Sequence, residues 1–172
     1  MRHADRVRIA CLAQLVNVIP AIRTLDGGPA WLQTSAYPFA DVARSARGTV
    51  LRLDIDGPTY ALDDGSFVEA IEATVVHDED TGRLALFAVN RLDRALTFEA
   101  TLRGLDGLAV DEHTVLADPD LRSSNTADEP LRVVPRSAHA ATVDRDRLAV
   151  VLPPRSWNVV RLSGRALEGA AG

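Results

Sequence analysis

The stretch Leu96-Thr97-Phe98-Glu99-Ala100-Thr101-Leu102 decides the fold class of this 172-residue chain. Apolar and polar side chains alternate through it without a break. In an extended strand, successive side chains point to opposite faces, so the apolar residues share one face and the polar residues share the other. The stretch therefore predicts an antiparallel strand with one buried face and one face in water.

Similar runs recur from Thr49 to the end of the chain, with turn residues rather than helical stretches between them. We place strands near Leu51–Ile55, Phe67–His77, Leu84–Asn90, Leu96–Leu102, Val110–Leu116, Leu148–Leu152 and Trp157–Leu162. Turns are expected at 63–65, 78–82 and 104–107, the last as a hairpin, and a polar surface loop at 117–137. Without helical crossovers, the strands are expected to pair antiparallel in two packed sheets. The prediction is mostly β, a β-sandwich over residues 49–164 with a frayed tail at 165–172.

The residues before the strands follow a different pattern. Between Asp5 and Ile19, apolar residues recur at helical spacing, and the remaining positions are apolar as well. This pattern predicts a helix that is buried on nearly all faces inside something larger. A second short helix is expected from Pro38 towards Arg44, with Gly48 near its end. Residues 1–48 are thus expected to form a helical lead-in.

Charge, hydropathy and cysteine content limit the kinds of binding partner and the cellular compartment to be expected. The net charge is −5 with both signs interspersed, so no basic surface points to nucleic acid. No apolar run is long enough for a membrane span. The single cysteine, Cys11, has no internal disulfide partner, and residues 1–5 lead into no secretory signal. We expect a cytoplasmic protein that binds neither nucleic acid nor membrane.

A complete set of catalytic residues is not recognisable. Cys11 lies in the apolar lead-in, where a buried and inert thiol is expected rather than a nucleophile. The four histidines are scattered, and no phosphate-binding glycine loop is present. The acidic run Asp78–Asp80 suits either calcium or a solvated hairpin tip, and the hairpin tip is favoured. We therefore predict no catalytic residue, no metal site and no cofactor in this chain.

Two polar residues and two aromatic residues leave alternatives open. Gln14 and Asn17 would share one face of the predicted helix, either satisfied by backbone groups at its end or facing a ligand pocket. Trp31 and Trp157 could stack on a sugar, although large aromatic residues more often anchor a core or an interface.

Several motifs in one order resemble a known enzyme family over nearly the whole chain. They are Arg2–Val7 followed by Ile9–Ile19, Gly27–Trp31 with Gln33-Thr34, Tyr37–Phe39, Phe87–Arg91, Asn125–Ala127, Val133–Pro135 and Ser156–Leu162. Together they are similar to the C-terminal part of the α-L-arabinofuranosidases of glycoside hydrolase family fifty-one.

The resemblance implies a catalytic (β/α)8 barrel followed by a jelly-roll sandwich, in an enzyme that removes terminal arabinofuranose from arabinose-containing oligosaccharides with retention. Residues 1–48 would be the last barrel elements, and Gln14 would be the glutamine that contacts the sugar. Both catalytic glutamates of the family lie upstream of this chain, so the chain alone is expected to be inactive. The implied partners are an arabinofuranosyl oligosaccharide and either a second copy or a complementing upstream barrel chain.

The resemblance is incomplete at two positions, and it implies a gap. Pro20 stands one place earlier than in the family pattern, and Leu32 replaces a basic residue. The family sandwich also takes a strand from the enzyme's N-terminus, so an edge or apolar face of this chain is expected to be uncovered. The alternatives are a free-standing carbohydrate-binding module and a purely structural β-sandwich.

Overall fold

The computed structural model describes residues 3–7, 9–19 and 21–164. The first elements are a short hairpin, β1 (Ile22–Thr24) and β2 (Ala30–Leu32), and one helix, α1 (Ala36–Ser45). The remaining strands are β3 (Thr49–Leu51), β4 (Thr59–Ala61), β5 (Phe67–Glu69), β6 (Ile71–Asp78), β7 (Arg83–Asn90), β8 (Leu96–Thr101), β9 (Leu108–Leu116), β10 (Arg136–Ala138), β11 (Ala141–Asp144), β12 (Arg147–Leu152) and β13 (Ser156–Gly164). The predicted frayed tail at 165–172 and the shifted Pro20 lie outside the described residues.

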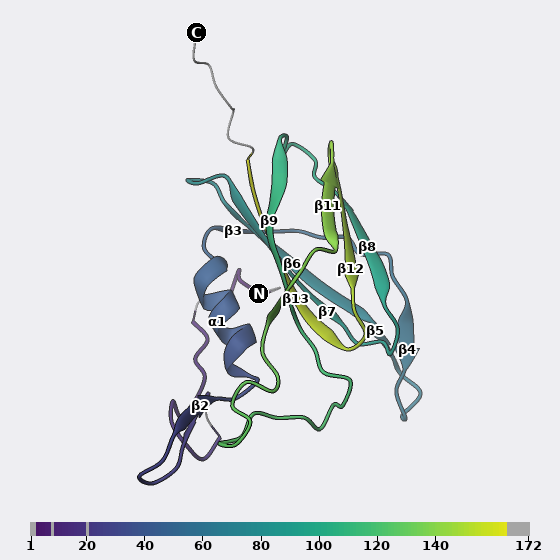
Figure 1. Ribbon diagram of the computed structural model, residues 1–172. Coiled ribbons are helices and arrows are strands. Elements are labelled where there is room, and N and C mark those ends of the chain that lie inside the picture. Colours follow the sequence, from purple (N-terminus) through teal and green to yellow (C-terminus); the bar gives the residue numbers. More distant parts are fainter. Residues whose placement is uncertain (1–2, 8, 20, 165–172) are drawn as a thin grey trace.

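Two antiparallel sheets form the sandwich that the strand pattern predicted (Figure 1). The larger sheet has the order β10-β9-β13-β7-β6-β3, and the smaller has the order β11-β12-β8. Apolar side chains from both sheets meet in one core, including Leu86 and Leu162 from the larger sheet and Leu148 and Leu152 from the smaller. The prediction of a mostly β, antiparallel sandwich is confirmed.

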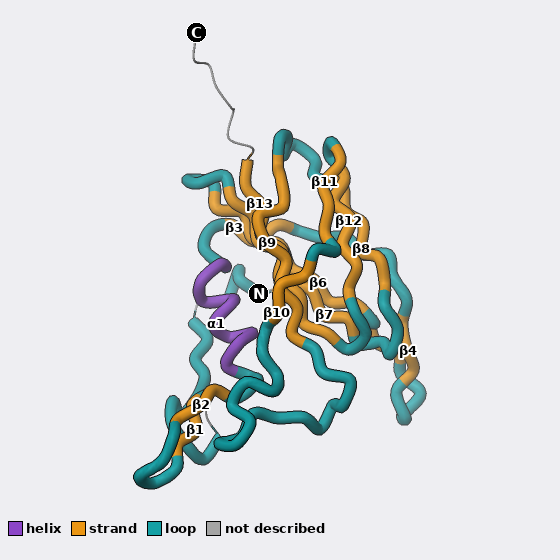
Figure 2. The backbone as a smooth tube through the Cα atoms, in the orientation of Figure 1, coloured by secondary structure: helices purple, strands orange, loops and turns teal. Residues whose placement is uncertain are grey.

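Helix α1 covers the other face of the larger sheet (Figures 1 and 2). Val42 of the helix and Ala46, its C-cap residue, pack against Val76, Phe87 and Val159. The larger sheet is therefore covered on both faces in its centre, which explains why β7 is apolar at nearly every position while β8 alternates. The short helix predicted at 38–44 is confirmed.

Four local predictions are wrong. The strand predicted near Leu51–Ile55 ends at Leu51, and the strand predicted over Phe67–His77 is divided into β5 and β6, which belong to different sheets. None of the described residues between 5 and 19 is helical, so the predicted helix over Asp5–Ile19 is absent from that segment. Gly104–Gly107 turns the chain as expected, with positive φ at both glycines, but it is not a hairpin. It connects β8 in the smaller sheet to β9 in the larger one, so the chain crosses from one sheet to the other there.

Gly48 separates the helical region from the sandwich. Its φ is +115°, and a Cβ on this residue would lie 2.1 Å from the carbonyl oxygen of His77. Only glycine combines this backbone conformation with so close an approach of another strand. The residue that the sequence places near the end of the helix thus lets β3 start beside β6.

Candidate functional site

Gln14, the predicted sugar-contacting residue, is exposed and lies outside regular secondary structure. Its φ is +50°, and Asn17 and Val18 have φ values of +55° and +67°. A right-handed helix contains no such residues, so Gln14 and Asn17 do not share a helical face as predicted. Positive φ at a β-branched residue such as Val18 is uncommon, and Val18 is 76% exposed.

Asn17 has protein partners for both ends of its amide. Its Nδ2 donates to Thr24 Oγ1 at 2.8 Å, and the Thr24 N–H donates to its Oδ1 at 2.9 Å. Of the two interpretations of this residue, satisfaction by protein groups is the one that the structure bears out. The partner is a residue of strand β1, however, rather than the end of a helix.

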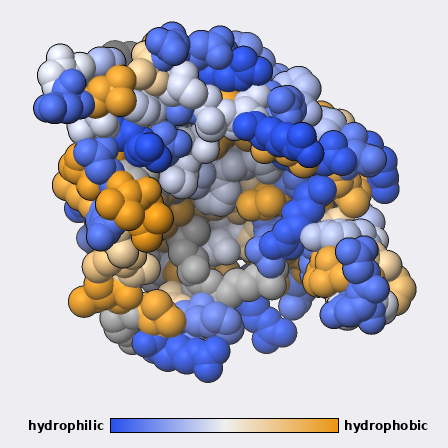
Figure 3. All heavy atoms as spheres, turned by 90° about the horizontal axis from the view of Figure 1, so that it is seen from below, coloured by the Kyte–Doolittle hydropathy of each residue, from blue (hydrophilic) through white to orange (hydrophobic). Residues whose placement is uncertain are grey.

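Apolar side chains around Gln14 are largely exposed. Ile9 is 82% exposed, Ile19 is 72% exposed, and Leu15 and Val18 are similarly open. Cys11 is also exposed, so the prediction of a buried thiol is wrong for this chain. Figure 3 views the hairpin end of the molecule and shows hydrophobic atoms gathered on the side where the hairpin lies. Exposed apolar residues at this density are more than a monomeric surface usually carries.

The β1–β2 hairpin is fastened to the sandwich at Asn125, which is 2% exposed. The Trp31 indole N–H and the Gln33 side-chain amide donate to its main-chain oxygen at 3.0 and 3.3 Å. The Asn125 side chain in turn donates to Leu32 O at 2.9 Å and accepts from Val133 N–H at 2.8 Å. Three of the motifs that carry the resemblance, at 27–34, 125–127 and 133–135, therefore meet in one partly buried junction around Asn125.

The two tryptophans connect different elements of the fold. Trp31 donates to Asn125, as described above, and the Trp157 ring stacks on Phe87 with 5.8 Å between ring centroids. The Trp157 indole N–H also donates to the Asp41 carboxylate of α1 at 3.2 Å. Trp157 is thus a packing anchor between α1 and the larger sheet, and Trp31 holds the hairpin to the sandwich through its N–H.

A charged cluster joins α1 to strand β13. Asp41 is buried and accepts a hydrogen bond from Arg161 at 3.3 Å in addition to that from Trp157. The same arginine binds Ser45 and, at 2.6 Å, the exposed carboxylate of Glu112. Sequence reasoning missed Asp41, although a lone aspartate on the inner side of an amphipathic helix was a signal that could have been used.

Buried polar residues close the end of the sandwich. The Asn90 amide donates to the carbonyls of Arg94, Leu152 and Pro153, within 3.1 Å, and accepts from Leu92 N–H. Asn158 links His113 Nε2, at 3.2 Å, to the hydroxyl of Ser156.

His113 itself is 2% exposed, and its Nδ1 has no partner within hydrogen-bond distance. Burial away from water lowers the pKa of His113, and the hydrogen bond to Asn158 opposes this only in part. The neutral imidazole is therefore the form that the fold accommodates.

The acidic residues of the turns stabilise the turns themselves. Asp78 Oδ1 accepts from the backbone N–H groups of Asp80 and Thr81, and hydrogen bonding by Thr81 lowers the pKa of Asp78. Asp64 accepts from both the hydroxyl and the N–H of Ser66, and these bonds lower the pKa of Asp64. The carboxylates cap their own loops. Within the described ranges, no group of three or more His, Cys, Asp or Glu side chains is arranged to hold a metal ion.

A cleft of about 670 Å³ opens between the two sheets, and its lining is both apolar and charged. Its walls include Phe98 and Leu102 from the region of β8, Leu86 and Leu162 from the larger sheet, and Leu53 from the segment after β3. β8 pairs with β12 on one side, and among the described residues no strand pairs with its other side. The resemblance led us to expect an uncovered edge or apolar face; in the described part of the chain β8 has an unpaired edge beside this cleft, whereas Leu86 and Leu162 in its wall are buried.

These features define a class of protein. It is a β-sandwich domain with an exposed apolar N-terminal segment, and a hairpin holds that segment to the domain. Residues 1–156 match the family described as "Alpha-L-arabinofuranosidase C-terminal domain". The chain belongs to this family.

Known arabinofuranosidases are similar to this chain over nearly its whole length. The chain is 44% identical over 167 residues to an intracellular exo-α-(1→5)-L-arabinofuranosidase of Streptomyces lividans, covering 96% of this chain and 25% of the relative. A solved family 51 α-L-arabinofuranosidase of Bifidobacterium longum superposes with a TM-score of 0.86 and 38% identity, over 93% of this chain and 32% of that one. A GH51 arabinofuranosidase of Xanthomonas axonopodis pv. citri gives 0.84 and 30%, over 94% and 32%. The chain thus corresponds to the C-terminal domain of these enzymes and spans about a quarter to a third of their length.

Proposed function

We propose that this chain is the C-terminal part of a retaining exo-α-L-arabinofuranosidase that removes terminal arabinofuranose from arabinose-containing oligosaccharides in the cytoplasm. In this proposal residues 1–48 belong to the last part of the catalytic (β/α)8 barrel, and residues 49–164 are the accessory sandwich. The carrying observation is the family match over residues 1–156, together with 44% identity to an enzyme named as an intracellular exo-acting arabinofuranosidase.

The exposed lead-in segment, by which we mean the described residues between 3 and 19, supports this division of the chain. Its sequence is apolar on all sides, yet Ile9, Leu15 and Ile19 are exposed here. The remaining three quarters of the Streptomyces lividans relative have no counterpart in this chain. A barrel packed against the lead-in would remove these side chains from water, at about 25 cal/mol for each square ångström of apolar surface. The cleft beside β8 would be covered in the same way by a further strand of the enzyme.

Gln14 is the residue that we assign to the substrate. An amide both donates and accepts hydrogen bonds, which suits the hydroxyl groups of a sugar. The two carboxyl groups that a retaining glycosidase needs would come from the barrel. The role of this chain in catalysis is then to bind and orient the sugar rather than to attack it.

A chimaera tests the proposal. The region of the Streptomyces lividans relative that matches this chain would be replaced by this chain, and hydrolysis of an aryl α-L-arabinofuranoside would be measured. We expect an active chimaera, and an activity that Gln14→Ala lowers by roughly tenfold or more, the usual scale for a lost hydrogen bond to a substrate. This chain by itself is expected to show no turnover.

The outcomes separate the parts of the proposal. A folded but inactive chimaera would contradict the assignment of the whole chain to this activity. An active chimaera that is indifferent to Gln14→Ala would contradict the assignment of Gln14 alone. Turnover by this chain alone, abolished by a single acid-to-amide change within it, would contradict the upstream origin of the catalytic carboxylates.

A further inference from the structure

A closed loop begins immediately after Gln14. The Ile22 N–H donates to the carbonyl of Leu15 at 3.2 Å, and the Asn17 N–H donates to the carbonyl of Ile22 at 2.9 Å. Val16 and Ile22 form an isolated β-bridge across the same loop. The backbone that leaves Gln14 is thus hydrogen-bonded to the first strand of the hairpin within one residue.

The side chain of Asn17 joins this loop to Thr24 of strand β1. Its amide makes two hydrogen bonds to Thr24, one to the backbone N–H and one to the hydroxyl, at 2.9 and 2.8 Å. Asparagine is also among the few residues that readily adopt the left-handed conformation found here, φ +55°. Position 17 therefore combines a backbone requirement with a side-chain contact, and the two can be separated by substitution.

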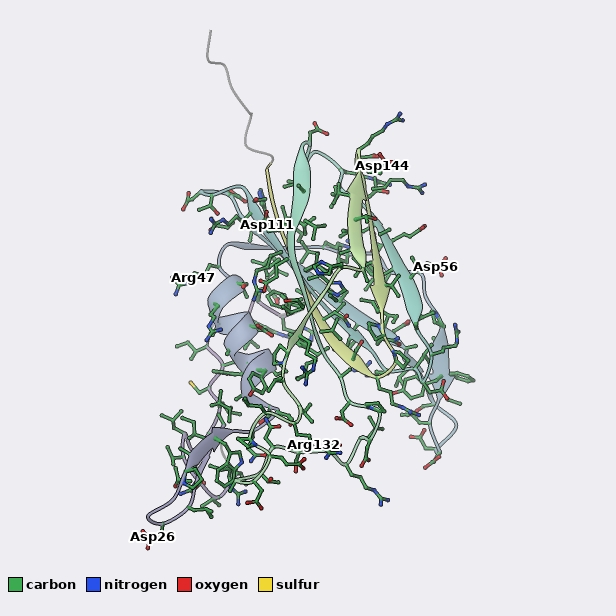
Figure 4. All side chains as sticks on the ribbon, in the orientation of Figure 1. Asp26, Arg47, Asp56, Asp111, Arg132 and Asp144 are labelled. Atoms are coloured by element: carbon green, nitrogen blue, oxygen red, sulfur yellow. The ribbon has the colours of Figure 1, made fainter. Side chains whose placement is uncertain are left out.

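The hairpin that carries Thr24 is in turn fixed to the sandwich. Strand β1 pairs with β2, and the Gln33 N–H donates to the carbonyl of Ala21 at 2.9 Å. Trp31 and Gln33 then donate to the main-chain oxygen of Asn125 in the long loop. Figure 4 shows the two ends of this unit, with Asp26 at the tip of the hairpin and Arg132 in the loop near its base.

We propose that Asn17 is a positioning residue for Gln14. The Trp31–Asn125 hydrogen bond fixes the hairpin to the sandwich, and the hairpin in turn fixes the backbone at Asn17. The inference rests on the proposed role of Gln14 in sugar binding. In this arrangement the sandwich does more than cover the barrel: it sets the backbone from which a substrate-binding side chain projects. An error of about 1 Å in such a side chain can lower an enzyme's rate by about a hundredfold.

Amide hydrogen exchange in this chain tests the mechanical link. Asn17→Gly keeps the left-handed conformation but removes both side-chain hydrogen bonds, and we expect exchange at the Ile22 amide to rise by roughly tenfold. Asn17→Asp keeps one oxygen for the Thr24 N–H and offers the other to the Thr24 hydroxyl, so exchange is expected to stay within about threefold of the wild type. The Leu86 amide in the core of the sandwich should be unchanged in both variants.

A matched pair of tryptophan variants tests the link to the sandwich. Trp31→Phe removes the indole donor to Asn125, and Trp157→Phe removes the same donor where it binds Asp41. Faster exchange at Ile22 is expected in Trp31→Phe alone. The proposal is overturned if Ile22 keeps wild-type exchange in both Asn17→Gly and Trp31→Phe, or if Trp157→Phe accelerates it equally.

Kinetics of the chimaera described above test whether Asn17 acts through Gln14. Asn17→Gly should lower kcat/KM by roughly tenfold to a hundredfold, with activity restored in Asn17→Asp. In a Gln14→Ala background, Asn17→Gly should cost little more, because the group that it positions is already gone. Fully additive losses would overturn the positioning role while leaving Gln14 as a substrate contact. If Gln14→Ala alone is harmless, the proposed site fails, and the exchange experiments still decide whether the link exists.

Discussion

The sandwich and the lead-in segment (the described residues between 3 and 19) differ in where their packing partners lie. In the sandwich, apolar residues such as Leu86 and Leu152 meet partners from the opposite sheet and are at most 1% exposed. In the lead-in segment, equally apolar residues such as Leu15 and Val18 remain in water. The same residue types thus give a packed core in one region and an open surface in the other. A hydrophobic pattern specifies that a segment is to be buried, but not which part of a protein buries it.

The sharpest test of this difference is to remove the same side chain in both regions. Leu86→Ala is expected to lower the free energy of unfolding by about 2 to 5 kcal/mol, because it deletes buried atoms and leaves a cavity. Leu15→Ala, in the lead-in segment, is expected to change it by no more than about 0.5 kcal/mol. Urea denaturation followed by circular dichroism measures both. Equal losses in the two variants would show that the lead-in segment is packed in solution.

Asparagine residues allow a polar version of the comparison. Asn90→Ala removes a buried amide that serves three carbonyl oxygens, and a loss of about 3 kcal/mol is expected because the buried carbonyl of Leu152 loses this donor away from water. Asn17→Gly removes two bonds at a partly buried site, where water can replace them, so less than about 1 kcal/mol is expected. Thermal or urea unfolding of the two variants, side by side, gives the ratio. A larger loss at Asn17 would contradict the view that the lead-in segment adds little to the stability of the sandwich.

The junction between helix α1 and the sandwich should lie between these extremes. Asp41→Ala removes the buried acceptor of Trp157 and Arg161, and a loss of about 1 to 2 kcal/mol is expected. Glu112→Ala removes the exposed partner of the same arginine and serves as the control, with less than about 1 kcal/mol expected. Trp157 fluorescence should report the first change and not the second. Equal effects would mean that the burial of Asp41 is unimportant.

The smallest expected effect is a pH dependence confined to the sandwich. Because burial lowers the pKa of His113 below the unfolded value of 6.5, the unfolded chain binds more protons as the pH falls through that region. The free energy of unfolding should therefore be highest above about pH 6.5 and fall as the pH drops below this value.

Replacing His113 provides the control for this pH dependence. His113→Leu should flatten the fall, whereas His139→Gln, at an exposed position, should keep it. Urea titrations at several pH values provide the measurement. A fall of the same steepness in His113→Leu would assign the pH dependence to other groups.

Sequence patterns predicted the sandwich well because its periodicity reports its own packing. The alternation at 96–102 identified β8 with its buried face, and the near-continuous apolar run of β7 followed from burial on both faces. The short strands β1, β2, β4, β10 and β11 were missed, since three or four residues carry too little periodicity to recognise. The helix predicted over the lead-in segment was wrong for a related reason: a run that is apolar on every side has no period that separates helix from strand.

The candidate site divides in the same way. Gln14 was assigned through the resemblance, and its role stays a prediction. Asn125 and Asp41, the residues that tie the N-terminal elements to the sandwich, could not be found from local pattern. Asn125 meets its partners across 92 to 94 residues of sequence. Asp41 meets Trp157 and Arg161 across 116 and 120 residues.

The sequence by itself determined the class of fold, the main strands of the sandwich, the helix at 36–45 and membership of the arabinofuranosidase C-terminal family. These follow from side-chain alternation, turn residues and motif order, which are local properties of the chain. Only the tertiary structure decided that the lead-in segment is open, that a cleft remains beside β8, and that Asn17 and Asn125 fix the hairpin between them. The Asn125 contacts and the cleft join residues far apart in sequence, and the Asn17–Thr24 bonds depend on how the chain turns between them, which side-chain alternation does not encode.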